Sequence, residues 1–388
     1  MCQLLTLANN DAPPTAHFFC FNTCRKIWLK VKRFFRRQIE IAQTIARIRA
    51  VKKEIDAKPG TSGKESQAAN SLLKFYRWRF YMGNDITKFL RISKPPFELS
   101  SLLALYAGID LEKEIQITDE AWILDGIKLP LVASQIGGLW DNELGDIVLP
   151  SYLRRKPACV SSDRYCDTFY GYMGEGPYEY GDVYLNDGDV VFDCGANMGL
   201  FSAVASRYGA EVYAFEAIPD IIDNYLSKTA SMNENIRIQN VAVWDKEETL
   251  EFSLVPDNIG ASYTNQLHPQ LHPHWNHNNF KQFTVPTITL DAFVEQNGIK
   301  RVDFIKADIE GAERNMLRGA TRILKEFAPK LSICTYHLPD DPQVIRKIIL
   351  EANPQYQIVE KFKKMYAHVP QRVSNTRTQT PHSFRKAS

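Results

Sequence analysis

The sequence has no long uninterrupted apolar run. Charged residues interrupt its apolar stretches well before the roughly 18–20 residues that a membrane-spanning helix needs. The apolar stretch at residues 16–24 is too short to cross a bilayer, and basic residues follow it instead of preceding it, which is the wrong order for a secretory leader. We therefore expect neither a transmembrane helix nor a signal peptide.

Regularly spaced cysteines are also missing. The seven cysteines are scattered along the chain, and none forms a CxxC pair. The sequence therefore indicates neither a disulfide framework nor a CxxC metal site. We expect reduced thiols and a cytoplasmic protein, with peripheral attachment at the inner membrane surface as the alternative.

An excess of charge of one sign is absent as well. The 47 Lys and Arg residues against 45 Asp and Glu leave a net charge of +2. The whole-chain charge thus gives no argument for nucleic acid, and we expect no nucleic-acid partner. The length of 388 residues, 44% of them hydrophobic, excludes a wholly disordered protein and is enough for two modest domains.

Positive charge is concentrated in Arg25–Arg37 (RKIWLKVKRFFRR), which contains seven basic residues and no acid. Its apolar residues recur near helical spacing and predict a basic amphipathic helix that continues towards Ile55. Two roles remain open for this helix. It rests on an anionic membrane surface, or it packs its apolar face on the rest of the protein or on a second subunit.

The composition divides the chain into four segments. Residues 1–125 are predicted to be a mainly helical N-terminal region, and residues 126–180 to be connecting loops and short strands. In residues 181–370, short apolar runs alternate with helical patterns, which is typical of βα units in a mostly parallel sheet covered on both faces. Residues 371–388 are polar and basic and are expected to be disordered.

The strands of the third segment are predicted from its apolar runs. The last two form an antiparallel edge hairpin, and an insertion between the third and fourth strands adds two more pieces. The predicted strands are Val190–Asp193, Glu211–Phe215, Ile236–Val243, Val302–Ala307, Lys330–Thr335, Gln357–Phe362 and Met365–Val369, with Thr249–Leu254 and Phe283–Ile288 in the insertion.

The first predicted strand ends in a glycine turn, Cys194-Gly195-Ala196-Asn197-Met198-Gly199. Gly195 has no Cβ to fill the ligand space, and Gly199 lets the following helix pack close to the strand. Asp193 distinguishes this turn from the GxGxxG dinucleotide motif, because a carboxylate repels phosphate and favours an amine or a cation. S-adenosylmethionine carries both a protonated amine and a sulfonium.

Polar residues at the ends of the next two strands support the same ligand. Glu216 follows the second strand about twenty residues after the glycine turn, where an acid accepts hydrogen bonds from both ribose hydroxyls. Asn240, at the end of the third strand, is expected near the adenine ring. These positions depend on the predicted strand order.

A second charged motif follows a buried run near residue 305. Lys306, Asp308, Glu310 and Glu313 lie within eight residues, and His337 follows the neighbouring strand. Charges at the end of a central strand must be paired, bound to a ligand or open to a cleft. An ion-pair network at a helix N-terminus is the structural alternative.

These motifs together resemble the FkbM-like family of S-adenosylmethionine-dependent methyltransferases. The resemblance covers about residues 175–369 and leaves the first 170 residues largely unexplained. Its most specific block is IKADIEGAERNMLRGA. The matching segments are FDCGANMGLFS at 192–202, AFEAIP at 214–219, TLDAF at 289–293, IKADIEGAERNMLRGA at 305–320 and TYHLPDD at 335–341, preceded by GEGPYEYGDV.

The resemblance implies the class I methyltransferase fold, a Rossmann-like, seven-stranded, mostly parallel sheet with a C-terminal antiparallel hairpin. It implies O-methylation of a hydroxyl, and we expect the acceptor to be a sugar, glycan or glycolipid precursor in glycan biosynthesis. It also implies that S-adenosylmethionine is bound by five residues of the first two motifs, and that three acids border the reaction site. The five are Asp193, Gly195, Asn197, Gly199 and Glu216, and the three are Asp308, Glu310 and Glu313.

Proton removal from the acceptor needs a base. Asp308 and His337 are the candidates, with Lys306 holding the carboxylate ionised. A divalent metal bound by Asp308 and Glu310 is the alternative, but no metal site is predicted because these ligands are not diagnostic. Glu310 and Glu313 are assigned to the substrate side.

A histidine-rich insertion lies at residues 268–277. Its two prolines disfavour one helix, so His268 and His272 cannot be assumed to share a face as metal ligands. We expect a polar loop over the pocket, in which Trp275 stacks on a sugar.

Two other functions remain open. A non-catalytic scaffold would keep the fold and assemble partners through residues 1–170. A nicotinamide-dependent oxidoreductase would use the same type of sheet, but Asp193 and Asn197 replace the phosphate-binding pattern that it requires. The oligomeric state is not predicted.

Overall fold

The fold is described from a computed structural model of the chain. The predictions for Arg25–Arg37, for Trp275 with the rest of the histidine-rich insertion, and for residues 371–388 lie outside the described residues. The structure describes residues 42–43, 45–57, 63, 65–70, 72–73, 107, 109, 114–130, 147–156, 160–169, 176–254, 262–267 and 280–370.

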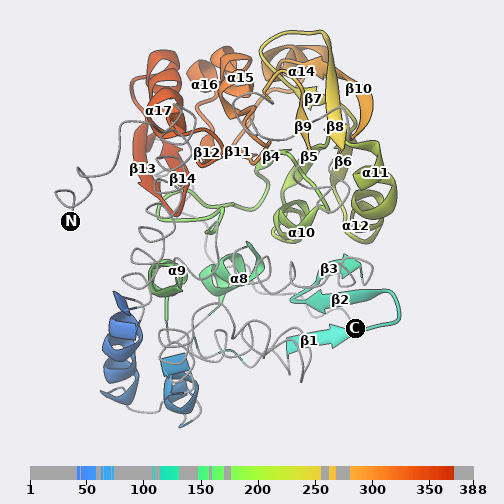
Figure 1. The fold of residues 1–388 in the computed structure, drawn as a ribbon. Helices are drawn as coiled ribbons and strands as arrows, with labels where there is room; N and C mark the ends of the chain where they lie inside the picture. The colour runs from blue at the N-terminus through green and yellow to red at the C-terminus, as the bar shows by residue number, and fades with distance from the viewer. Residues whose placement is uncertain are drawn as a thin grey trace, which may run out of the picture.

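Seven strands form the central sheet, in the order β13-β14-β12-β11-β4-β5-β6 (Figure 1). Each strand from β12 through β11, β4 and β5 to β6 is parallel to its neighbour in this order. In contrast, β14 is antiparallel to both β12 and β13. The predicted α/β fold is confirmed. The strands are β4 (Val190–Cys194), β5 (Glu211–Phe215), β6 (Ile236–Gln239), β11 (Phe304–Ala307), β12 (Lys330–Cys334), β13 (Gln357–Lys361) and β14 (Lys364–His368).

Helices cover both faces of this sheet (Figure 1). On one face Val191, Val212 and Phe304 pack with α10, and on the other Phe192 and Ile305 pack with α14 to α17. Successive strand residues point to opposite faces, so buried strands with apolar residues at every position require two cores. The helical elements are α10 (Leu200–Arg207), α11 (Pro219–Ile221), η3 (Ile222–Leu226), α12 (Ser227–Met232), α14 (Leu290–Gln296), α15 (Glu313–Arg318), α16 (Thr321–Glu326) and α17 (Asp341–Ala352).

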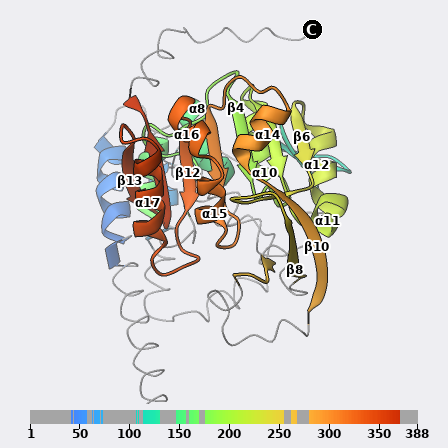
Figure 2. The ribbon, with the colours of Figure 1, turned by 90° about the horizontal axis from the view of Figure 1, so that it is seen from above.

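The insertion forms a second sheet with the order β7-β10-β8-β9, and β8 and β10 extend beyond the main sheet (Figure 2). Its strands are β7 (Ala242–Val243), β8 (Thr249–Leu254), β9 (Tyr263–Thr264) and β10 (Lys281–Ile288). The prediction of one strand over Ile236–Val243 is wrong. The Val241 amide donates to the Gln239 carbonyl at 3.0 Å, and this tight turn directs the next residues into the second sheet.

The N-terminal region contains an antiparallel sheet, β1-β2-β3, which the prediction of a mainly helical region missed. Asp125 and Gly126 join β2 to β3 with φ of 53° and 84°, the geometry that an Asp-Gly hairpin turn favours. Asn233, which follows α12, bonds both backbone groups of Lys128 in β3. The strands are β1 (Ile115–Ile117), β2 (Ala121–Leu124) and β3 (Ile127–Pro130), and residues 45–57 and 65–70 are helical.

Two helices, α8 (Leu149–Arg155) and α9 (Ser162–Phe169), lie where loops and short strands were predicted over residues 126–180, so that prediction is wrong for these residues. Pro150 is at the start of α8, a position where its fixed φ suits a helix and its missing N–H costs nothing. No helix within the described ranges has the length and hydropathy needed to span a membrane.

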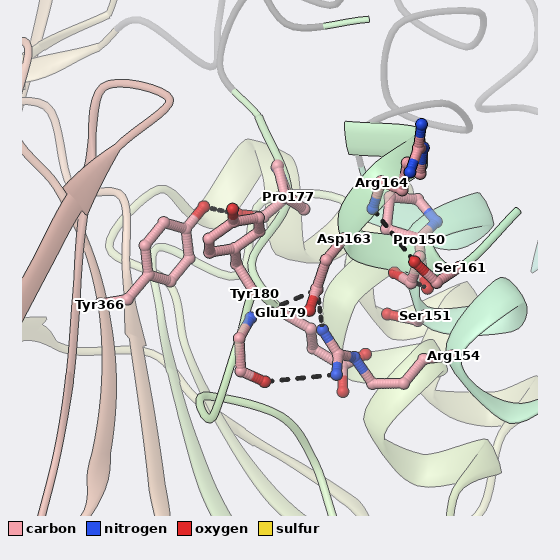
Figure 3. A network of polar contacts seen from close by, with 12 residues as sticks. Pro150, Ser151, Arg154, Ser161, Asp163, Arg164, Pro177, Glu179, Tyr180 and Tyr366 are labelled. Atoms are coloured by element: carbon pink, nitrogen blue, oxygen red, sulfur yellow. Dashed lines mark hydrogen bonds and ion pairs between the residues drawn. The ribbon is translucent and has the colours of Figure 1, made fainter. Parts of the chain in front are cut away.

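These helices hold the segment that leads into β4 (Figure 3). Arg154 bonds Asp163 and the Gly181 carbonyl, while the hydroxyl of Tyr366 donates to the carbonyl of Pro177. The buried carboxylate of Glu179 accepts two hydrogen bonds from Arg155, at 2.9 and 3.0 Å. Residues 177–181 are therefore fixed on both sides.

Candidate active site

The carboxyl ends of β4 and β11 bring the glycine turn against the loop after β11. The Asp308 amide donates to the Cys194 carbonyl at 3.1 Å. A Cβ on Gly195 would lie 2.0 Å from the Asp308 carbonyl oxygen, and its φ is +74°. The glycine is therefore required because the Asp308 backbone passes there, and its role in leaving space for a ligand stays a prediction.

Gly199 has a different role from the one predicted. Its φ is +83°, and a Cβ there would lie 2.7 Å from Leu226 and 3.0 Å from Thr229. The missing side chain thus allows η3 and α12 to pack against the start of α10, rather than α10 against its own strand.

Asp193 lies beneath the turn, where it is fully buried. Its carboxylate is 3.0 Å from the ammonium of Lys306 and accepts a hydrogen bond of 2.6 Å from Ser202. Lys306 also donates to the Gly195 carbonyl at 2.6 Å. Asp193 was predicted to bind a cationic ligand, but the cation that faces it in the structure is this lysine.

The charge of Lys306 is maintained by its acidic neighbours. Burial would lower its pKa, but the carboxylates of Asp193 and Asp308 outweigh burial and raise it. Lys306 is therefore protonated and links the glycine turn electrostatically to Asp308.

Glu216, after β5, lies beside the turn with its side chain buried. Its two carboxylate oxygens accept the backbone N–H groups of Asn197 and Ile218, each at 2.9 Å. Burial raises the pKa of Glu216, and these hydrogen bonds oppose the shift. Asn240 is exposed nearby and donates to the Glu216 carbonyl at 3.1 Å.

On the other side of the turn, Asp308 accepts hydrogen bonds from two tyrosine hydroxyls. Tyr178 donates to Oδ2 at 2.7 Å and Tyr336 to Oδ1 at 3.1 Å. Burial alone would raise the pKa of Asp308, but the charges of Lys306 and Lys364 lower it to about 2. The carboxylate is therefore ionised at neutral pH.

His337 lies between three acids. Its Nδ1 is 3.0 Å from Oε1 of the fully buried Glu313, while its Nε2 is 3.7 Å from both Asp308 Oδ1 and Glu310 Oε2. Burial would lower the pKa of His337, but the three acids raise it to about 10. A general base works best with a pKa near the working pH. The assignment of the base to Asp308 or His337 stays a prediction.

Residues 193–373 match the family described as the methyltransferase FkbM domain. Over these residues, a little under half of the chain, the sequence is similar to the FkbM methyltransferase family. The hexuronic acid methyltransferase AglP of Haloferax volcanii is 25% identical over 172 residues, which are 44% of this chain and 66% of that protein.

Two solved structures are also similar to this chain. The FkbM methyltransferase of Methylobacillus flagellatus aligns with a TM-score of 0.36 and 17% identity, over 61% of this chain and 62% of its own. The Methanococcus jannaschii fibrillarin pre-rRNA processing protein aligns with a TM-score of 0.29 and 16% identity, over 49% and 69%. The chain thus covers just under two thirds of AglP and of the FkbM structure.

The residues that match the FkbM domain bring most of the predicted site residues to one edge of the sheet. Lys306, Asp308, Glu310, Glu313 and His337 form one cluster, and Glu216, Asn197 and Asn240 lie across the glycine turn. Trp275 is not among the described residues.

Three residues that contact or face Asp308 were not predicted. Tyr178 precedes the FkbM match, and Lys364 begins β14, at the far end of the chain. Tyr336 directly precedes His337 within the matched TYHLPDD segment. Its place in that segment was a usable signal, as was the place of Tyr178 in GEGPYEYGDV, whereas Lys364 reaches the site only through the fold.

Proposed function

We propose that this protein is an S-adenosylmethionine-dependent O-methyltransferase that acts on a hydroxyl of a sugar, glycan or glycolipid precursor. The supporting observation is the pairing of two carboxylate sites across one glycine turn. Glu216 lies on one side, and Asp308 with its neighbours lies on the other. Similarity to the FkbM methyltransferase family supports the reaction class.

The residues beside the turn fit the cofactor. Each oxygen of Glu216 accepts one backbone N–H, and a carboxylate oxygen can accept a second hydrogen bond, so a ribose diol can donate to both. Asn197, with φ of +50° and a partly exposed side chain, and Asn240 complete the polar edge. When bound there, S-adenosylmethionine supplies a methyl group activated by its sulfonium.

The chain's own contribution to methyl transfer is positioning. The ionised Asp308, fixed by Tyr178 and Tyr336, can accept a hydrogen bond from the acceptor hydroxyl and so orient its oxygen. Holding two reactants in line is worth at most roughly 7–11 kcal/mol of the barrier. Lys306 connects this carboxylate to the glycine turn, so one ion-pair network fixes both halves of the site.

The sugar acceptor is supported by the relative from Haloferax volcanii, whose name specifies a hexuronic acid. A sugar hydroxyl is a neutral donor, and the Asp308 cluster offers the acceptor oxygens that such donors need. Attachment at a membrane surface through Arg25–Arg37 remains part of the proposal, because glycolipid precursors are found there.

The test is methyl transfer from labelled S-adenosylmethionine to a panel of neutral sugars, uronic acids and their lipid-linked forms. We expect cofactor binding by calorimetry and alkali-stable label in a sugar. Alkali-labile label would indicate a methyl ester and would overturn hydroxyl methylation. No binding at millimolar cofactor by the folded protein would favour the scaffold, and binding of a nicotinamide cofactor instead would favour the oxidoreductase.

A further inference from the structure

Three buried polar atoms next to Asp308 make no hydrogen bond. They are Oε2 of Glu313 and both ring nitrogens of His337, although Nδ1 of His337 lies 3.0 Å from Oε1 of Glu313. Glu313 is completely buried, and the side chain of His337 is 5% exposed. Polar atoms at such depth are nearly always hydrogen-bonded or bound to a ligand, because their desolvation is otherwise uncompensated.

These atoms belong to a compact set of metal-ligating side chains. Asp308, Glu313 and His337 each offer one ligand atom, and all three atoms lie within 4.8 Å of one another. Glu310 is a fourth: its Oε2 is 3.7 Å from Nε2 of His337, and its side chain is 30% exposed. We propose that Asp308, Glu313 and His337 bind one divalent cation, with Glu310 on its open side.

The charges around the cluster favour a cation. Three carboxylates surround one imidazole, so the carboxylates outnumber the one positive charge that a protonated imidazole offers, and buried carboxylates need compensating charge. The ammonium groups that act on Asp308 are those of Lys306 and Lys364, but Lys306 is 3.0 Å from Asp193.

The donor atoms indicate the class of metal. Carboxylates suit Mg²⁺ and Mn²⁺, and an imidazole nitrogen shifts the preference towards Mn²⁺, Fe²⁺ or Zn²⁺. Asp308 retains acceptor capacity for a cation, because an ionised carboxylate has about four lone-pair sites and the two tyrosines use two of them. The cluster therefore fits a hard to borderline dication.

The site adjoins the proposed methyl-transfer centre. The Asp308 amide donates to the Cys194 carbonyl at the head of the glycine turn. A cation bound here can coordinate the acceptor hydroxyl and lower the pKa of that hydroxyl. This catalytic role rests on the proposed function, whereas cation binding does not.

The test is Mn²⁺ binding by the full-length protein after chelator treatment, with no methyl donor present. We expect one Mn²⁺ per chain, seen as loss of the sharp paramagnetic resonance signal of free Mn²⁺. Asp308→Asn and Glu313→Gln are expected to weaken binding on the order of 10-fold or more. Glu326→Gln removes an exposed acid at the end of α16 and should bind like the wild type.

Glu310→Gln is the second variant, chosen in case the buried variants fail to fold, because the Glu310 side chain is partly exposed. The Glu310→Gln protein should retain the wild-type circular dichroism spectrum and bind Mn²⁺ several-fold more weakly. No stoichiometric binding at millimolar Mn²⁺, or equal binding by all folded variants, would overturn the site. A protein that binds S-adenosylmethionine but not Mn²⁺ overturns only this inference. A protein that binds Mn²⁺ but not S-adenosylmethionine supports the metal site and contradicts the proposed function.

Discussion

The ammonium of Lys306 lies 3.0 Å from the Asp193 carboxylate, and both side chains are almost completely excluded from solvent. A buried ion pair of this kind makes each charge depend on the other. Removing one partner leaves an uncompensated charge, whereas removing both does not.

We therefore expect Lys306→Met and Asp193→Asn each to lower the free energy of unfolding by about 3–5 kcal/mol. The double variant should lose clearly less than the sum of the two. Urea unfolding followed by circular dichroism measures all three. Strictly additive losses would show that the two groups are not coupled.

Substitution of Gly195 tests the close approach of the loop after β11. Gly195→Ala combines φ of +74° with a Cβ placed 2.0 Å from the Asp308 carbonyl oxygen, so the loop must move. Gly298→Ala is the matched control, because Gly298 has φ of +62° but no atom within 4 Å of its Cβ. The control should cost about 1–2 kcal/mol for its backbone conformation.

We expect Gly195→Ala to cost more than the control in thermal unfolding and also to displace Asp308. Turnover should therefore fall in Gly195→Ala and remain normal in Gly298→Ala. Equal stability losses in the two variants would contradict the close contact.

The two tyrosine hydroxyls that donate to the Asp308 carboxylate provide a test of catalysis. Tyr178→Phe removes one hydrogen bond to the carboxylate without removing the ring, and hydrogen bonds to charged groups contribute about 1.5–3 kcal/mol. We expect kcat to fall on the order of 10-fold, with little change in the Kd of the cofactor. Tyr213→Phe, whose hydroxyl bonds Glu211 away from the cluster, is the control.

The buried pair between Arg155 and Glu179 predicts a dependence of stability on pH. Burial would raise the pKa of Glu179, but Arg155 and the surrounding hydrogen bonds outweigh it and hold the pKa below the ordinary 4.5. The stabilisation is therefore present above about pH 4.5 and is lost as the pH falls through the lower pKa of the folded state.

Glu179→Gln should be less stable than the wild type at pH 7, by about 3–5 kcal/mol, and the difference should shrink in acid. Urea unfolding at pH 7 and at several values below 4.5 measures it. Glu54→Gln is the control, because its pair with Arg164 is exposed and should contribute less than about 1 kcal/mol at any pH. A constant difference between Glu179→Gln and the wild type would contradict the assignment.

The central strands were predictable because they are buried on both faces. For β5 the predicted bounds are those observed, and for β4 and β12 they differ by one residue, since continuous apolar runs mark such strands. The hairpin of β2 and β3 was missed although Asp125-Gly126 is a strong turn signal, because residues up to 125 were assigned to a mainly helical region and those from 126 to connecting loops and short strands.

The sequence predicted where the site residues lie better than it predicted which groups they contact. Strand ends placed Asp308 and His337 in one cluster, because the carboxyl ends of parallel strands share an edge. The partner of Asp193 could not be predicted, since Lys306 is distant in the sequence and the two meet only when β4 and β11 pair in register. Tyr178 is likewise separated from Asp308 by 130 positions.

The way residues 177–181 are fixed extends the candidate site beyond the residues that match the family. The family match starts at residue 193, yet Tyr178 and the arginines of α8 that secure its neighbours lie before it. A fragment trimmed to the matched residues would keep the acids and lose one of the hydroxyls that orient them. A fragment that is to keep the Asp308 cluster intact must therefore extend back at least to α8.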